Sequence, residues 1–96
     1  MLVVSDNPVI SRFEMPSGDT MAFVEYRRAG DRIVLTHTEV PEALSGQGVG
    51  SKLVVGVLDQ IRSQGSMVVA ECEFVAAFIR RHPGYQSLEA QNEGST

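Results

Sequence analysis

A glycine-rich segment in the middle of the chain carries the clearest chemical signal. Residues 46–51 read Gly-Gln-Gly-Val-Gly-Ser, between a β-branched stretch and a periodic apolar stretch. Where such a loop opens a helix, backbone N–H groups and the helix dipole favour a phosphate. Glycine has no Cβ to block a close approach of the ligand. The segment therefore predicts a phosphate-binding turn, although a purely structural turn would look similar in isolation.

Two common phosphate motifs do not fit this segment. The Walker A pattern G-x-x-x-x-G-K-[S/T] fails because Ser51 stands before Lys52 instead of after it. The dinucleotide pattern G-x-G-x-x-G fails because the glycines here are spaced G-x-G-x-G. The segment therefore indicates another class of phosphate ligand.

Cys72 is the single cysteine of the chain, so no intramolecular disulfide is expected. It stands between a short apolar run and a second periodic stretch, where a helix dipole lowers a thiol pKa. Its neighbours Glu71 and Glu73 oppose that shift, because nearby negative charge disfavours a thiolate. Cys72 could donate a proton, act as a nucleophile or simply fill space at a strand end.

His37 is the second candidate for proton transfer, because an imidazole titrates near neutral pH. It lies in a β-branched stretch, four and two residues after Ile33 and Leu35. Simple alternation along a strand would place all three on one face. That placement favours a hydrogen-bonded structural histidine over a base.

The first half of the chain predicts three strands that would position these residues. They cover residues 9–15, 20–28 and 32–40, separated by turn clusters at 17–19 and 29–31 and closed by Pro41. Short turns between consecutive strands favour an antiparallel meander. The first strand is expected to lie between Pro8 and Pro16.

The second half changes to helical spacing. One apolar stripe predicts a helix that ends at Gly65, and a second predicts a helix that ends at Pro83. Residues 67–70 form an apolar run between them and predict a buried strand. The expected order β-β-β-α-β-α gives an α/β fold with a mixed sheet, an antiparallel meander plus one parallel crossover. A ligand site is expected at the carboxyl end of the third strand.

Length and composition set further bounds. Ninety-six residues predict one domain, over residues 1–88, and the polar residues 89–96 predict a disordered tail. A formal charge of -4 argues against nucleic acid as a partner. With no apolar stretch of membrane-spanning length and no signal peptide pattern, a cytoplasmic protein without membrane contact is expected.

The glycine segment resembles the acyl-CoA motif [R/Q]-x-x-G-x-[G/A] of the GNAT acetyltransferases. The resemblance runs from Ser45 to Gly50 and follows Val40-Pro41, as in that family. The pair Gly84-Tyr85 is similar to a later family motif, and residues 37–41, 72–75 and 79–83 look like a subfamily of very small GNAT proteins. The resemblance covers about Phe13 to Leu88.

This resemblance implies a minimal GNAT fold and an N-acetyltransferase that uses acetyl-CoA, releases coenzyme A and acetylates a primary amine. The acceptor would be a small amine, a protein lysine or a protein N-terminus. Backbone N–H groups of the loop would hold the pyrophosphate, and these residues are Gly46, Gln47, Gly48, Val49, Gly50 and Ser51. The end of the third strand would pair with the pantetheine arm through Thr38, Glu39 and Val40.

The resemblance also has departures. Ser45 stands where the family has Arg or Gln, and Arg80 stands where many members have a tyrosine that protonates the leaving thiolate. We therefore expect Cys72 as the acid and His37 or a water as the base. Arg80, Arg81 or Lys52 would supply charge for the terminal phosphates. The alternatives are a non-catalytic module that binds CoA or acyl-CoA, and a protein-interaction domain. No metal site is expected, and the oligomeric state is left open.

Overall fold

The computed structural model describes residues 3–44, 46 and 48–90. The elements follow one another from the first strand to a final 3₁₀ helix. They are β1 (Ser5–Asn7), β2 (Arg12–Ser17), β3 (Thr20–Ala29), β4 (Arg32–Glu39), the 3₁₀ helix η1 (Glu42–Leu44), α1 (Val49–Ser63), β5 (Met67–Ala70), α2 (Glu73–Arg81) and the 3₁₀ helix η2 (Pro83–Leu88).

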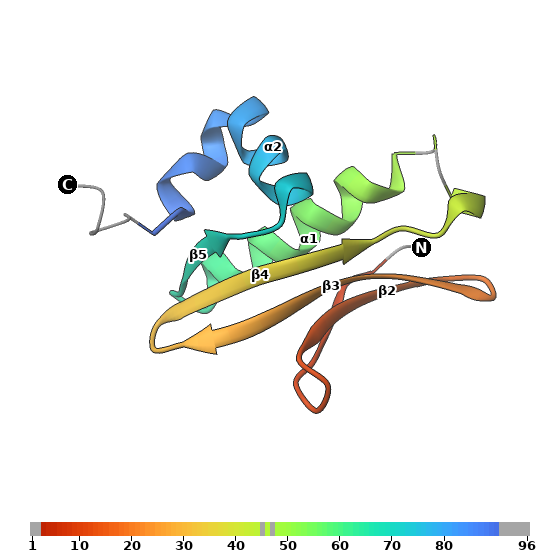
Figure 1. Ribbon diagram of the computed structural model, residues 1–96, viewed down its shortest axis with the longest axis horizontal. Coiled ribbons are helices and arrows are strands. Elements are labelled where there is room, and N and C mark those ends of the chain that lie inside the picture. The colour runs from red at the N-terminus through yellow and green to blue at the C-terminus, as the bar shows by residue number, and fades with distance from the viewer. Residues whose placement is uncertain (1–2, 45, 47, 91–96) are drawn as a thin grey trace.

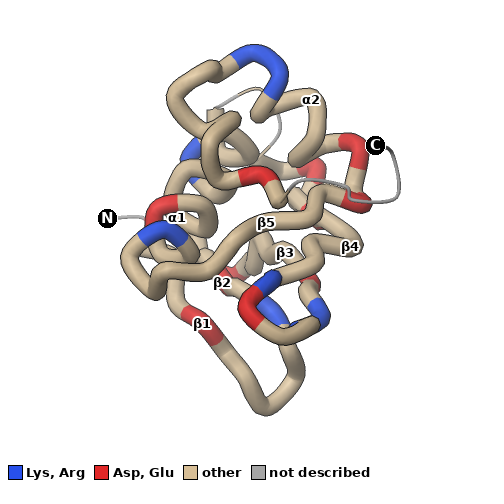
Figure 2. The backbone as a smooth tube through the Cα atoms, turned by 90° about the vertical axis from the view of Figure 1, so that its left-hand side faces the viewer, with Lys and Arg blue, Asp and Glu red and all other residues tan. Residues whose placement is uncertain are grey.

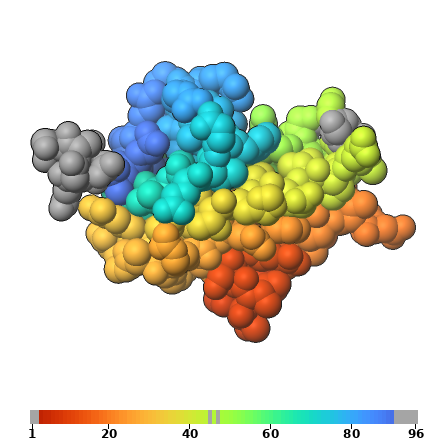
Figure 3. Space-filling model, viewed as in Figure 1, coloured from red at the N-terminus to blue at the C-terminus, as the bar shows by residue number. Residues whose placement is uncertain are grey.

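The five strands form one sheet in the order β1-β2-β3-β4-β5. Strands β1 to β4 are antiparallel, whereas β5 runs parallel to β4 after the crossover through α1 (Figure 1). The predicted mixed sheet, with its meander and single parallel crossover, is therefore confirmed. In Figure 3 the later part of the chain, from green to blue, lies over the strands of the first half.

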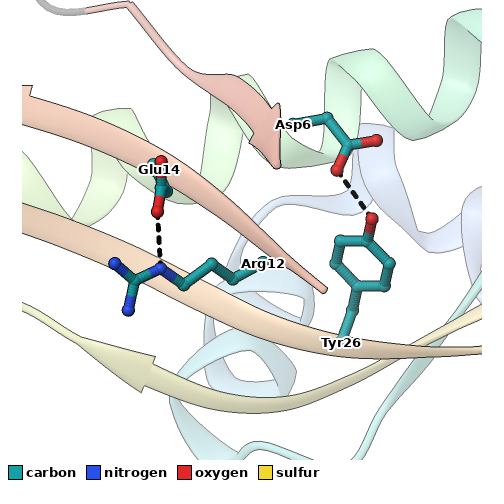
Figure 4. Close-up of polar contacts among 4 residues, drawn as sticks. All are labelled: Asp6, Arg12, Glu14 and Tyr26. Carbon is teal, nitrogen blue, oxygen red and sulfur yellow. Dashed lines mark hydrogen bonds and ion pairs between the residues drawn. The ribbon is translucent and has the colours of Figure 1, made fainter. Parts of the chain in front are cut away.

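The N-terminal edge of the sheet differs from the prediction. Residues 8–11 form a turn, and β2 begins at Arg12 and continues through Pro16. Pro16 is tolerated because β1 pairs only with residues 12–14, so this end of β2 has no neighbour on that side. The unpredicted strand β1 is fastened to β3 by the Tyr26 hydroxyl, which donates to Asp6 Oδ1 at 2.6 Å, close to the ion pair of Arg12 with Glu14 (Figure 4).

A β-bulge interrupts the pairing of β3 with β4. Tyr26 lies opposite Leu35, but Glu25 lies opposite His37, so Thr36 is an extra residue on β4. The bulge breaks the alternation of faces along the strand. Thr38 consequently lies opposite Val24, which is fully buried, while His37 lies on the other face.

The hydrophobic core lies between the sheet and the helices. Helix α1 packs against β3 and β5, and α2 contacts α1, β4 and β5. The predicted stripe of α1 is confirmed, and its residues are fully buried. They are Leu53, Val54, Val57, Leu58 and Ile61. The second predicted stripe, on α2, is confirmed for Val75, Phe78 and Ile79, whereas Phe74 is exposed. None of the helices in the described ranges is long and apolar enough to cross a membrane.

The ordered chain continues beyond Leu88. Glu89 forms a parallel bridge with Val68, and the N–H of Ala90 donates to the Val68 carbonyl at 2.7 Å. Two residues of the predicted tail are therefore paired with β5, because this strand has a free edge that accepts hydrogen bonds. Residues 91–96 lie outside the described part of the chain.

Candidate functional site

The glycine loop leads directly into α1. Gly48 is the N-cap of the helix with φ of 74°, and Gly46 has φ of 81°. Both values lie in the left-handed region, which glycine enters without the steric cost that a Cβ brings. Two other predicted loop residues, Ser45 and Gln47, lie outside the described residues.

The first turn of α1 presents backbone donors. The earliest intrahelical hydrogen bond runs from Lys52 N–H to the Gly48 carbonyl, at 3.1 Å. The N–H groups of Val49, Gly50 and Ser51 precede that bond, so the helix itself gives them no acceptor. The first turn has no acidic residue. Donors without nearby carboxylates fit a phosphate group.

A pocket of about 280 Å³ borders this loop. It joins three parts of the chain: the exit of β4, the glycine loop and the start of α2. Its lining residues are Val40, Leu44, Gly46, Gly48, Val49, Gly50, Ser51 and Phe74. Phe74 is 46% exposed and lies so close to α1 that a Cβ at Gly50 would come within 2.7 Å of its ring. A side chain at Gly50 would therefore have to displace the exposed Phe74 ring, whereas the backbone angles of Gly50 do not call for glycine.

Strands β4 and β5 separate beside this pocket. Their pairing ends at Leu35 and Ala70, and the Leu35 carbonyl accepts from the N–H groups of both Glu71 and Cys72 at 3.0 Å. The chain then turns into α2, whereas β4 continues to Glu39 with only β3 beside it. The separation leaves an edge of β4 that an extended ligand can pair with.

Cys72 lies at this separation, as the N-cap of α2. Its half-buried thiol is 3.2 Å from the Thr38 hydroxyl, across the gap between the strands. Burial raises the pKa of the Cys72 thiol, but hydrogen bonds from the Thr38 side chain and from backbone N–H groups of Val75, Phe74 and Thr38 outweigh it. The pKa therefore lies below its ordinary value, so the thiol gives up a proton more readily.

His37 does not lie with Cys72. Its side chain is 54% exposed, and its Nε2 lies 3.0 Å from Glu39 Oε1, within hydrogen-bond distance. The expectation that His37 shares a face with Ile33 and Leu35 is wrong, because the bulge at Thr36 reverses the alternation. His37 instead lies on the open face near Phe23, with ring centroids 6.4 Å apart.

The remaining predicted site residues divide into two groups. Val40 lines the loop pocket and Thr38 contacts Cys72, so both lie along the path from the loop to the thiol. Arg80 is not brought to the loop pocket: it is exposed and its Nη2 lies 2.6 Å from Glu73 Oε2. Figure 2 shows the basic end of α2 at the top of the molecule.

A second pocket, of about 370 Å³, lies between α1, α2 and the segment before β1. Sequence reasoning missed it, because its walls come from segments far apart in the chain. The available signal was spacing: Lys52, Val55 and Gly56 share one side of α1, and Phe78 and His82 are one turn apart. Within the described residues, no group of three His, Cys, Asp or Glu side chains could hold a metal ion.

A family model described as GCN5-related N-acetyl-transferase matches residues 12–88. The chain belongs to the GCN5-related N-acetyltransferase family. The match includes the glycine loop, Cys72 and both long helices. The predicted resemblance is confirmed, and the family supports N-acetyltransferase activity in general, with acetyl-CoA as the usual donor.

Curated relatives of this GCN5-related chain include Protein NATD1 from several vertebrates. The Bos taurus protein is 35% identical over 69 residues, which are 71% of this chain and 61% of that protein. The Homo sapiens protein is 33% identical over 69 residues, again 71% of this chain and 61% of the relative. The chain therefore spans less than two thirds of the length of these relatives.

A solved structure has the same architecture. The solution NMR structure of a GCN5-like protein from Staphylococcus aureus superimposes with a TM-score of 0.71 at 26% identity. The superposition covers 94% of this chain and 89% of that one. The five-stranded mixed sheet with its helices is therefore a GCN5-related N-acetyltransferase fold.

Proposed function

We propose that this chain transfers the acetyl group of acetyl-CoA to a primary amine, with the Cys72 thiol as proton donor to the leaving group. One observation carries the proposal: the gap between β4 and β5 runs from the glycine loop to the contact between Cys72 and Thr38. The glycine loop would hold the pyrophosphate of acetyl-CoA at one end of this gap. The reactive thioester would lie at the other end, beside Cys72.

Binding relies on the main chain. The N–H groups of Val49, Gly50 and Ser51 would hold the pyrophosphate, and the edge of β4 from Thr38 to Val40 would pair with the pantetheine arm. Backbone donors of this kind do not appear in a count of charges. A chain with a net charge of -4 can therefore bind a polyanion.

The chemistry needs little beyond orientation and one proton donor. Acetyl-CoA supplies an activated acyl group and a thiolate leaving group. A backbone N–H on the free edge of β4 would stabilise the oxygen that becomes negative during attack. Cys72 would give its proton to the leaving sulfur, after which the Thr38 hydroxyl and the N–H groups at the start of α2 hold the Cys72 thiolate.

The base lies on the other face of the sheet. His37 is exposed there, with its Nε2 3.0 Å from Glu39 Oε1. An amine that approaches from this open face would give its proton to His37 through water. This arrangement separates the acid, on the helix side of β4, from the base.

The direct test measures release of free thiol from acetyl-CoA in the presence of a panel of primary amines. Wild-type protein should release thiol with at least one amine, and Cys72→Ala should lower kcat by about a hundredfold, the typical contribution of a general acid. The KM for acetyl-CoA should change little, because Cys72 adds no binding contact in this scheme. Unchanged kcat in Cys72→Ala would remove Cys72 from the mechanism.

A second candidate function is a module that binds CoA or acyl-CoA without turnover. It is favoured by Arg80, which stands in place of the family's tyrosine and is occupied by its ion pair with Glu73. Calorimetry that detects acetyl-CoA binding, together with no thiol release for any amine, would establish this alternative. Mass spectrometry of the same mixture would show whether Cys72 becomes acetylated.

A further inference from the structure

Phe74 is a large apolar side chain that lies outside the hydrophobic core. It is the second residue of α2 and is 46% exposed, whereas Val75, Phe78 and Ile79 of the same helix are buried. The apolar stripe that packs α2 onto the rest of the fold therefore does not include it. Its ring instead lines the pocket at the glycine loop, beside Gly50.

The ring of Phe74 points at the first turn of α1. A Cβ at Gly50 would lie 2.7 Å from Cζ of the ring, 3.4 Å from Cε2 and 3.6 Å from Cε1. These three atoms form the outer edge of the ring, so Phe74 meets Gly50 end-on. Gly50 is the middle one of the three residues, with Val49 and Ser51, whose N–H groups have no acceptor within the helix. The ring therefore lies against the backbone that presents the phosphate donors.

The backbone of Phe74 lies beside the thiol of Cys72. Cys72 is the N-cap of α2, two residues before Phe74. Burial raises the pKa of this thiol, and hydrogen bonds from the Thr38 hydroxyl and from the N–H groups of Val75 and Phe74 lower it. One residue thus joins the donors of the glycine loop, through its ring, to the donors around the sulfur, through its N–H group.

We propose that Phe74 is a positioning residue that couples phosphate binding at the glycine loop to the reactivity of Cys72 through its contact with Gly50. The inference rests on the proposed function, because it takes a pyrophosphate at the loop and a leaving sulfur beside Cys72. A phosphate bound to the N–H groups of the loop fixes the first turn of α1. Gly50 then holds the ring, and the ring holds the first turn of α2 with its N–H groups toward the sulfur. Cofactor binding thereby prepares the proton donor before the amine arrives.

The contact can be tested from both of its sides. Phe74→Ala removes the ring, and Gly50→Ala adds a Cβ that must displace it. Each substitution should raise the pH midpoint of Cys72 alkylation by iodoacetamide, because each loosens the donors around the sulfur. In the double variant no ring remains to be displaced, so the effect of Gly50→Ala should vanish. The midpoint is the readout because truncation also changes how easily the reagent reaches the thiol.

Both variants should remain folded. Phe74 is nearly half exposed, so its truncation leaves little empty space, and alanine is a better helix former than glycine. Gly84→Ala is the matched control, because its Cβ would meet nothing within 4 Å. This control should leave the alkylation midpoint at the wild-type value.

A phosphate ligand separates coupling from local packing. Adenosine diphosphate carries a pyrophosphate but no pantetheine arm, so it can occupy the loop without reaching Cys72. Saturating adenosine diphosphate should lower the alkylation midpoint of the wild type but not that of Phe74→Ala. Its negative charge alone would raise the midpoint, so the sign of the shift identifies the route. The kcat of acetyl transfer in Phe74→Ala should fall by about tenfold, less than in Cys72→Ala, because the proton donor is misplaced and not removed.

Three outcomes would overturn the inference. Additive effects of Gly50→Ala and Phe74→Ala, with acetyl transfer that still depends on Cys72, would remove the coupling and leave the proposed function in place. The same would follow if adenosine diphosphate shifted the midpoint equally in the wild type and in Phe74→Ala. Absence of acetyl-CoA binding would overturn the inference and the proposed function together.

Discussion

At the scale of single residues, the contact between Cys72 and Thr38 sets the environment of the single thiol of the chain. A cysteine at a strand end is often only a small apolar group. Here a hydroxyl from the neighbouring strand lies 3.2 Å from the sulfur, and N–H groups at the start of α2 add to it. The position therefore favours the thiolate despite partial burial.

Thr38→Val should raise the pKa of the Cys72 thiol, because the substitution removes the hydroxyl and nearly keeps the side-chain shape. The rate of iodoacetamide alkylation against pH measures this pKa, with no interference from other thiols. The wild-type midpoint should lie below that of Thr38→Val. Thr38→Ser, which keeps a hydroxyl, should restore much of the wild-type value.

The lowered pKa of the Cys72 thiol makes the stability of the fold depend on pH. A thiol pKa that is lower in the folded chain stabilises the fold above the ordinary thiol pKa, and this stabilisation is lost as pH falls through the lowered value. The free-energy difference between wild type and Thr38→Val should thus grow as pH rises. A difference that is constant with pH would show that Thr38 acts through packing alone.

At the scale of elements, the start of α1 depends on glycine for two different reasons. Gly48 needs a left-handed backbone, with φ of 74°, whereas Gly50 needs space for the ring of Phe74. The contact of Gly50 with Phe74 places the first turn of α1 against the start of α2. The donors of the loop are positioned by the backbone path and not by any side-chain cap.

Gly48→Ala should lower the free energy of unfolding by about 1 kcal/mol, because a Cβ in the left-handed region is sterically costly. Urea denaturation measures this change, and acetyl-CoA affinity should fall with it as the loop relaxes. Gly84→Ala is the matched control, since its Cβ would meet nothing within 4 Å and its φ is not left-handed. Equal stability of the two variants would contradict the role given to Gly48.

Most elements could be predicted because their signals are local. The apolar residues of α1 recur at helical spacing, and those of β5 form a continuous run. The predicted strand over residues 67–70 has the same limits as β5. The bulge at Thr36 could not be predicted, because it arises from pairing between β3 and β4 and leaves no mark in composition. That single residue decides which face His37 occupies.

The candidate site, like the fold, could be predicted from the sequence only in part. The glycine loop and Cys72 could be found from the sequence, because a motif and a lone thiol are visible residue by residue. The contact of Cys72 with Thr38 and the pocket around Lys52 and His82 required the packing of α2 against α1. Long-range contacts of this kind depend on tertiary structure, which short patterns do not encode.

At the scale of the whole molecule, the sheet has one covered face and one open face. The helices α1 and α2 contact each other and pack against strands on the covered face. Figure 1 shows α1 behind the sheet. The open side carries polar residues such as Glu25, His37 and Glu39, which are exposed. An acceptor can therefore approach the gap beside β4 without displacing a helix.

Binding of acetyl-CoA should raise the melting temperature of the whole domain. At a free concentration of a hundred times Kd, a ligand that binds only the folded chain stabilises it by about 2.7 kcal/mol. For a domain of this size that corresponds to a rise in Tm of about 10 °C or more. Differential scanning calorimetry measures the shift, and pantetheine, which has no phosphate, should give a much smaller one. Equal shifts for the two compounds would contradict binding through the glycine loop.

The position of Val4 has a practical consequence for how the protein is handled. Its side chain packs on Gly56, and its carbonyl accepts from Gln60 Nε2 at 2.5 Å, so the beginning of the described chain forms a wall of the pocket with Lys52 and His82. An affinity tag fused at the N-terminal end would therefore be attached near a wall of that pocket. At the other end, Ala90 is paired with β5 and does not line the pocket. Purification through a C-terminal tag leaves the Val4 wall of the pocket unaltered.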